Sequence, residues 1–309
     1  LLDAIDPERP LLLWRMIQVM PPDSLESYSS VNYRAIMPTF DVLSVLTGRG
    51  DLAPALARCA ELRRGDASLS SLVLDDPTYS RVATLCEGAA QAQALGHVSQ
   101  MPWLLLWGPR GIGKRELATR IAAHAGRSLL AFDPNRVDQG MLDDLLRRAQ
   151  REALLRGAVL YLGPLRADLL ADNAKELLKR ITDYPSLVIL GLETQQQPRL
   201  KIERSLQEIE LPLPSEPVRR KLWESAVPAS RRGPDLDLDS MARAFHLTPG
   251  EIVETGRESA ELAELNKSGV ISHDEVRRGI DRRLRNELGD MARRIQVVAK
   301  WDDLVLPPE

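Results

Sequence analysis

The sequence predicts a mixed α/β protein with a five-stranded parallel sheet that carries helices on both faces. Between residues 101 and 228, short apolar runs alternate with segments of helical spacing, which is the pattern of strands joined by crossover helices. A glycine-rich loop connects the first apolar run to a helix. Only helical patterns follow over 229–298, and mixed patterns precede over 1–100. We therefore expect a small N-terminal α+β region and a C-terminal helical lid around the central domain.

The charge balance argues against binding nucleic acid through bulk electrostatics. The 309 residues include 41 Lys and Arg against 44 Asp and Glu, for a net charge of -3. The only two cysteines, Cys59 and Cys86, predict no disulfide framework and favour the cytoplasm. The four histidines are scattered, so no metal site is expected, and no apolar run reaches the ~20 residues that a membrane span needs.

The N-terminal region, residues 1–100, combines strand and helix signals. The apolar run 9–20 predicts a strand, and 28–38 is its candidate partner. Helical patterns cover residues 39–48, with Thr39 as N-cap and Gly48 just past the end, and then 51–65 and 76–96. Helices and a hairpin suit a winged-helix-like unit, and an irregular helical domain is the alternative.

The central domain, residues 101–228, contains the expected sheet. The run 103–107 is continuously apolar, as a strand buried on both faces requires. The other expected strands are 128–132, 158–162, 187–192 and 208–213, and helical spacing covers 141–157 and 166–184.

The lid, residues 229–298, follows a polar connector that contains prolines. Its expected helices cover 238–245, 248–265 and 272–288. Thr248 is a good N-cap with Pro249 at the first helical position, and Ser272 precedes Glu275 at the spacing of a capping box.

The glycine-rich loop fits the phosphate-binding pattern G-x-x-x-x-G-K. Glycines let backbone N–H groups turn toward phosphate oxygens, lysine adds a positive charge, and the following helix presents its positive end. The alternative is a chance glycine turn before a helix. The predicted nucleotide-binding residues are Gly108, Pro109, Arg110, Gly111, Ile112, Gly113, Lys114 and Arg115.

Two positions depart from a hydrolytic site. Arg115 stands where a Ser or Thr hydroxyl normally ligates Mg²⁺, and a guanidinium offers donors only. The strand 158–162 should end in acids that hold the metal and orient water, but it runs into Gly163 and Pro164. We therefore expect weak binding of ATP or ADP, no Mg²⁺, no other metal and no catalytic residues in this chain.

The order of these segments resembles an AAA+ ATPase module over residues 103–300, with a Walker A loop and a degenerate Walker B strand. The resemblance implies that Glu193 and Thr194 stand at the positions of the γ-phosphate sensor, where the family often has Thr-Asn. It also implies an arginine finger before the last strand. Arg199 and Arg204 are the candidates, and a solvated arginine is the alternative interpretation for each.

The end of the chain carries a closer resemblance. The segment 293–309, RRIQVVAKWDDLVLPPE, looks like the linker ahead of the intact second module in double-AAA bacterial ATPases, some of them encoded with phage-tail-like contractile injection systems. In these proteins the first module is often degenerate. The resemblance implies a linker at 299–309, a following AAA module as partner, and a homo-oligomeric ring.

The expected function is thus that of a regulatory or assembly module of a larger ATPase, with vestigial nucleotide binding. One alternative is an active AAA+ ATPase, which would need carboxylates delivered from elsewhere in the sequence or by a neighbouring subunit. The other is a nucleic-acid-binding initiator-like protein that joins a winged helix to the AAA+ domain, which the charge balance disfavours. The protein substrate or partner of the parent machine is not predicted.

Overall fold

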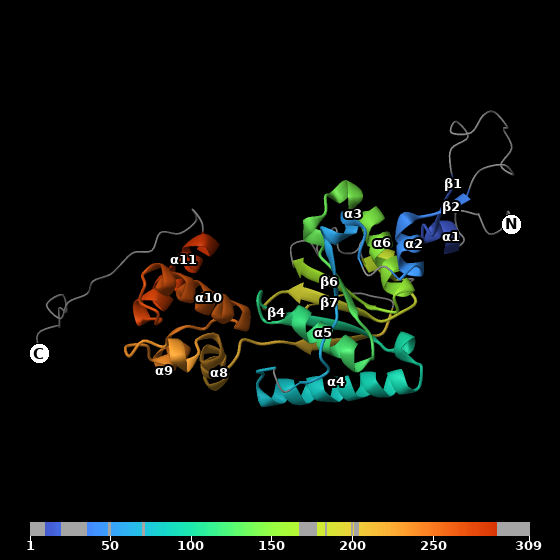
Figure 1. Cartoon of the computed structure of the whole chain (residues 1–309). Coiled ribbons are helices and arrows are strands. Elements are labelled where there is room, and N and C mark those ends of the chain that lie inside the picture. Colours follow the sequence, from blue (N-terminus) through green and yellow to red (C-terminus); the bar gives the residue numbers. More distant parts are fainter. Residues whose placement is uncertain are drawn as a thin grey trace, which may run out of the picture.

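A central six-stranded sheet organises the molecule (Figure 1). The computed structural model describes residues 10–19, 36–48, 51–69, 72–166, 178–182, 184–198, 200 and 204–288. The strand order is β3-β5-β6-β7-β4-β8. All five expected strands are present and parallel, as β4 (Trp103–Gly108), β5 (Leu129–Phe132), β6 (Val159–Arg166), β7 (Val188–Glu193) and β8 (Leu206–Glu210).

The sixth strand, β3 (Ala60–Arg63), corrects a prediction. The segment 51–65 reads as helical, but only α3 (Pro54–Ala57) forms there. The chain then pairs antiparallel with β5, and Ala60 lies opposite Phe132. Pairing with a distant edge strand supplies backbone hydrogen bonds that local helical propensity does not anticipate.

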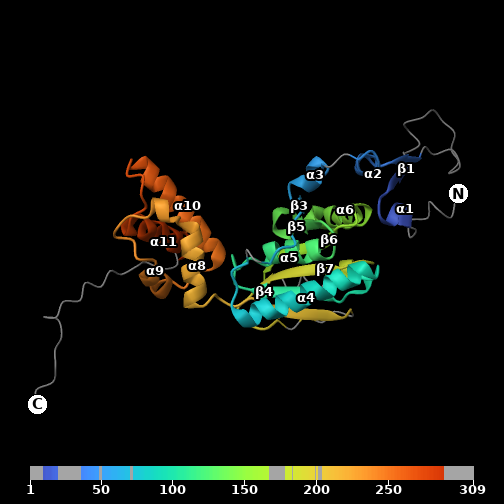
Figure 2. The ribbon, with the colours of Figure 1, turned by 60° about the horizontal axis from the view of Figure 1, so that its bottom comes forward.

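Both faces of the sheet are covered by helices. Trp103, Leu105 and Trp107 belong to the core beneath α6 (Leu142–Leu155), whereas Leu104 and Leu106 belong to the core on the other face. That second face is covered by α4 (Asp76–Ala94) and α5 (Lys114–His124), and Figure 2 shows α4 and α6 on opposite sides of the sheet. The expected helix 166–184 lies largely outside the described residues.

α4 lies before residue 100, packs against α5 and shares the apolar core on this face of the sheet, so the second half of the predicted N-terminal region contributes to the central layers. The division of the chain into domains stays a prediction. Among the described residues, no helix combines the length and the apolar character that crossing a membrane would require.

The helical lid lies beyond the last strand (Figures 1 and 2). It contains α9 (Leu238–Ala244), α10 (Pro249–Leu265) and α11 (His273–Leu288), close to the expected ranges. The preceding helix α8 (Glu216–Ala226) packs in the same apolar core, where its Trp223 is fully buried. Thr248 caps α10 and Ser272 forms a capping box with Glu275 at the start of α11, as the sequence predicts. Glu251 completes a second capping box at α10.

The N-terminal segment begins with α1 (Pro10–Leu13), a helical turn where the sequence suggested only a strand. The strand β1 (Ile17–Val19) follows and pairs antiparallel with β2 (Ile36–Pro38), the expected partner. The helix α2 (Phe40–Leu46) has Thr39 as N-cap, and Gly48 follows its end with φ +74°.

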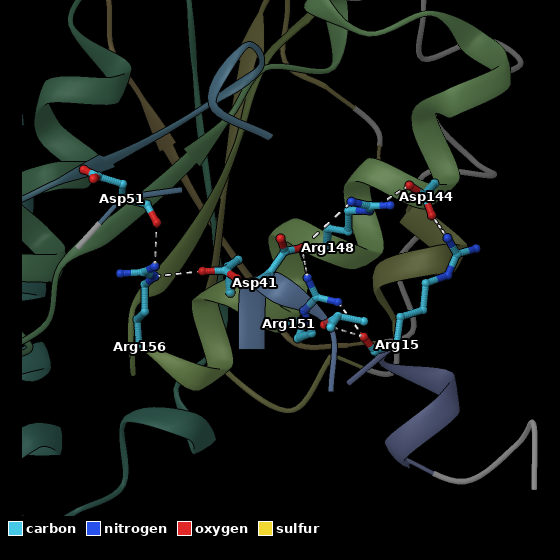
Figure 3. Close-up of polar contacts among 9 residues, drawn as sticks. Arg15, Asp41, Asp51, Asp144, Arg148, Arg151 and Arg156 are labelled. Atoms are coloured by element: carbon cyan, nitrogen blue, oxygen red, sulfur yellow. Dashed lines mark hydrogen bonds and ion pairs between the residues drawn. The ribbon is translucent and has the colours of Figure 1, made fainter. Parts of the chain in front are cut away.

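A charged network fixes this segment on α6 (Figure 3). Arg151 is 1% exposed, pairs with Asp41 of α2 and donates to the Arg15 carbonyl oxygen at 2.6 Å. Arg15 and Arg148 both pair with Asp144. Because buried arginines are almost always paired, the polar side of α6 is a docking face for the N-terminal segment.

Candidate functional site

The glycine-rich loop connects β4 to α5 in a backbone conformation that requires glycine. Gly108, Gly111 and Gly113 have φ of +152°, +76° and +98°, values that other residues rarely adopt. Gly113 is the N-cap of α5, so the first N–H groups of that helix lie at the loop. The backbone therefore has the geometry of an anion-binding turn.

Lys114 is folded into the loop. Its Nζ donates to the carbonyl oxygens of Gly108 at 2.9 Å and Pro109 at 2.8 Å, and the residue is 5% exposed. Burial lowers the pKa of Lys114 to about 8, and the negative charge of Glu193 opposes that shift. The ammonium group is thus held at the loop and is only moderately basic.

The lid contacts the loop directly. The N–H of Gly250, in the first turn of α10, donates to the carbonyl oxygen of Gly111 at 2.9 Å. A Cβ placed on Gly111 would lie 2.6 Å from Oγ1 of Thr248, the N-cap of α10. The starts of two helices, α5 and α10, therefore meet at the loop.

A cleft of about 890 Å³ opens between the loop and the lid. The loop contributes Pro109, Arg110 and Gly111 to its lining, and α10 contributes its first turn. Its volume lies within the range of about 300–1,000 Å³ that is usual for ligand sites. The cleft therefore has room for an organic group attached to a phosphate at the loop. Glu251, Glu254 and Glu258 of α10 also line it.

The end of β6 offers no acid where a hydrolytic site would have two. Gly163 is buried and Pro164 is half-buried, and the Pro164 carbonyl oxygen accepts from Asn135 Nδ2 at 2.6 Å. Arg115 is exposed on the first turn of α5. Among the described residues, no group of three or more His, Cys, Asp or Glu side chains could hold a metal ion. At positions 115, 163 and 164 the side chains thus offer no oxygen atom that could ligate Mg²⁺.

Glu193 and Thr194, at the sensor-like positions, lie beside the loop. Glu193 ends β7 opposite Gly108 of β4, and the Thr194 N–H donates to the Gly108 carbonyl oxygen at 3.3 Å. The sequence located both residues but did not indicate that the carboxylate of Glu193 acts on Lys114. Only the parallel register of β4 and β7 reveals this relation.

Arg204, one of the two arginine-finger candidates, lies away from the loop of its own chain. Arg204 precedes β8, at the amino ends of the strands, and the loop lies at their carboxyl ends. Its guanidinium lies 5.3 Å from the Trp103 ring centroid and donates to carbonyl oxygens of Tyr184 and Ser99. Arg204 is therefore half-buried and bound within its own chain, and its role as an arginine finger stays a prediction. Arg199 lies outside the described residues.

Comparison with known proteins identifies the fold. No family model matches the sequence, and no curated protein matches it. The structure resembles a solved structure of katanin, an AAA ATPase, from work on the structural basis for katanin self-assembly. The TM-score is 0.56 at 14% sequence identity, over 84% of this chain and 93% of the katanin chain. The chain therefore has an AAA+ type fold.

Proposed function

We propose that this chain is a regulatory or assembly module of a larger AAA+ ATPase. Its loop binds ATP or ADP weakly and without Mg²⁺, and hydrolysis does not occur at its own site. The observation that carries the proposal is the contrast at one edge of the sheet. Lys114 is buried in a complete glycine loop, while the second half of β6, which continues to Arg166, carries Gly163 and Pro164 where two acids would be needed.

The loop supplies what a phosphate needs. N–H groups at the start of α5, the ammonium of Lys114 and the cleft toward α10 suit a nucleotide whose phosphates lie on the loop. Bound nucleotide would contact both the loop and the lid, which the Gly111–Gly250 hydrogen bond already joins. Nucleotide could therefore influence how the lid is held.

Hydrolysis has different requirements. The transferred phosphoryl group develops charge that metal ions and preorganised donors must stabilise, and water must be oriented for attack. Arg115 cannot ligate Mg²⁺, and glycine and proline can neither bind it nor accept a proton. This supports a module that holds nucleotide without turning it over.

The partners follow from the same reasoning. The katanin work concerns self-assembly, and the shared fold supports a homo-oligomeric ring for this chain as well. We propose the following AAA module of the same protein as the active partner. Attachment to a contractile injection system and a cytoplasmic location remain parts of this proposal.

Binding of fluorescent ATP and ADP, with Mg²⁺ or with EDTA, tests the proposal. We expect weak binding that Lys114→Ala abolishes and that changes less than about threefold with Mg²⁺. Lys221→Ala is the matched control, because Lys221 is an exposed lysine on α8 that does not line the cleft. Steady-state phosphate release should stay at background. Turnover that depends on Lys114 would instead establish the active ATPase.

A further inference from the structure

Tyr161 lies on β6 two residues before Gly163, so the two positions face the same side of the sheet. That side is covered by α5, and Tyr161 is 2% exposed within its core. A Cβ on Gly163 would lie 2.8 Å from the Tyr161 hydroxyl oxygen, and one on Gly191 of β7 only 2.0 Å from it. The hydroxyl therefore fills the space into which an acid at position 163 would project.

No hydrogen bond of the Tyr161 hydroxyl is found among the described residues, and its oxygen, unlike that of Tyr184, is not one of the fully enclosed side-chain atoms that lack a partner. The hydroxyl is therefore open to a hydrogen bond with a ligand at the edge of the sheet that carries the glycine loop. Burial raises the pKa of Tyr161, and the positive charge of Arg115 opposes that shift. The hydroxyl thus keeps its proton at neutral pH and remains a hydrogen-bond donor.

The charged groups around the hydroxyl belong to the phosphate site. Arg115, Glu193 and Asp133 all act electrostatically on Tyr161, and Glu193 also acts on Lys114. Two cations are thus balanced by two carboxylates, so net charge alone does not favour an anion here. Directed donors must supply the preference for phosphate.

We infer that Arg115 and Tyr161 together replace Mg²⁺ in this site. The guanidinium supplies positive charge where the metal's hydroxyl ligand would stand, and the Tyr161 hydroxyl donates to a phosphate oxygen from the space of the missing acid. Arg115 and Gly163, the two departures from a hydrolytic site, are then parts of a single change. The site no longer holds a polyphosphate together with Mg²⁺ and instead holds a polyphosphate without metal. This inference rests on the proposed function.

Tyr161→Phe, measured in the full chain with ADP and ATP in EDTA, tests the contact. A hydrogen bond to a charged acceptor contributes enough that its loss should weaken binding roughly tenfold. Tyr184→Phe is the matched control, because Tyr184 is 1% exposed, also has an unpartnered hydroxyl, and packs in the core on the other face of the sheet. Tyr184→Phe should bind as the unmodified chain does.

The outcomes separate the inference from the proposed function. Unchanged binding by Tyr161→Phe, or equal losses in both tyrosine variants, overturns the inference and leaves the proposed function standing. If the unmodified chain shows no binding that depends on Lys114, the proposed function fails, and the phosphate contact of Tyr161 fails with it.

A second measurement, made in the absence of nucleotide, tests whether the Tyr161 side chain fills the space beside Gly163. Gly163→Ala should lower the midpoint of thermal unfolding by several degrees in the unmodified chain. In a Tyr161→Leu background, which lacks the hydroxyl and the outer part of the ring, the same substitution should lower it less, because only the Gly191 carbonyl oxygen, 2.9 Å from the added Cβ, still opposes it. Equal shifts in the two backgrounds would show that Tyr161 does not fill this space, and they would overturn the inference whatever the nucleotide result.

Discussion

The loop after β4 and the end of β6 lie at the same edge of the sheet and are separated only by β7, yet they are built in different ways. The loop depends on backbone, through three glycines with positive φ and the start of α5. The end of β6 could contribute only side chains, and here it offers Gly163 and Pro164. The geometry of the glycine loop therefore does not depend on which side chains stand in the second half of β6.

The two regions are also held by different contacts. The loop is anchored to its surroundings by backbone groups, because Leu211 donates to the carbonyl oxygen of Trp107 at 2.8 Å and Gly250 donates to that of Gly111. The end of β6 is filled by the ring of Tyr161. The following experiments test how the stability of the chain and its binding of nucleotide depend on the loop.

The largest effect is expected from Gly108→Ala. A Cβ at Gly108 would lie 2.2 Å from the Leu211 carbonyl oxygen, a backbone atom that cannot easily move. We expect a loss of about 3 kcal/mol or more in the free energy of unfolding, measured by chemical denaturation. Gly113→Ala is the control, because it is strained by its positive φ but meets no atom within 4 Å. It should cost about 1–2 kcal/mol, and equal losses would show that the loop is not held against Leu211.

Much of this fold could be predicted because its signals are local. Each of the five parallel strands appears as an apolar run, and Thr248 with Glu251 marks the start of α10. The strand β3 could not be predicted in this way, because Ala60 pairs with Phe132, which lies far along the chain.

The candidate site also has one part that is contiguous in the sequence and another that depends on strand pairing. The loop, with Lys114 and Arg115, is a contiguous motif, so the sequence located all of it. Tyr161 reads only as one residue of an apolar strand, and its relation to the site depends on Gly191 in another strand. Arg204 is an arginine-finger candidate because of its position before the last strand. Its contact with the Trp103 ring could not be predicted, because that contact depends on how β8 pairs with β4.

Lys114→Met should have the next largest effect, and its two consequences have opposite signs. Removing the ammonium should weaken ATP binding by about 100-fold, because a desolvated cation in hydrogen-bonding contact with phosphate contributes about 2–3 kcal/mol. The same change should leave thermal stability at pH 7 equal or slightly higher, since a buried charge disappears. Strong destabilisation of Lys114→Met would contradict this view of the loop.

The pH dependence should follow the lowered pKa of Lys114, about 8 in the folded chain. Between pH 8 and the ordinary lysine pKa of about 10.4, the unfolded chain binds a proton that the folded chain has lost, so this group adds stability as pH rises. Nucleotide needs the protonated form, so affinity should fall by up to about tenfold per pH unit above 8. Titrations of ADP from pH 7 to 9.5 measure this fall, which Lys114→Met should remove.

The smallest effect is expected from Glu193→Gln, which removes a negative charge beside the loop and keeps the shape of the side chain. Glu193 raises the pKa of Lys114, so the amide should move the midpoint of the ADP pH profile to lower pH. At pH 7, where Lys114 is still largely protonated, the loss of repulsion should strengthen ADP binding by about two- to fivefold. Asp138→Asn, at an exposed carboxylate, is the control for a change in overall charge. Because the two effects of Glu193→Gln differ in sign, tighter binding with an unchanged midpoint would mean that Glu193 faces the phosphate and does not act on Lys114. Weaker binding would mean that Glu193 helps to hold the nucleotide.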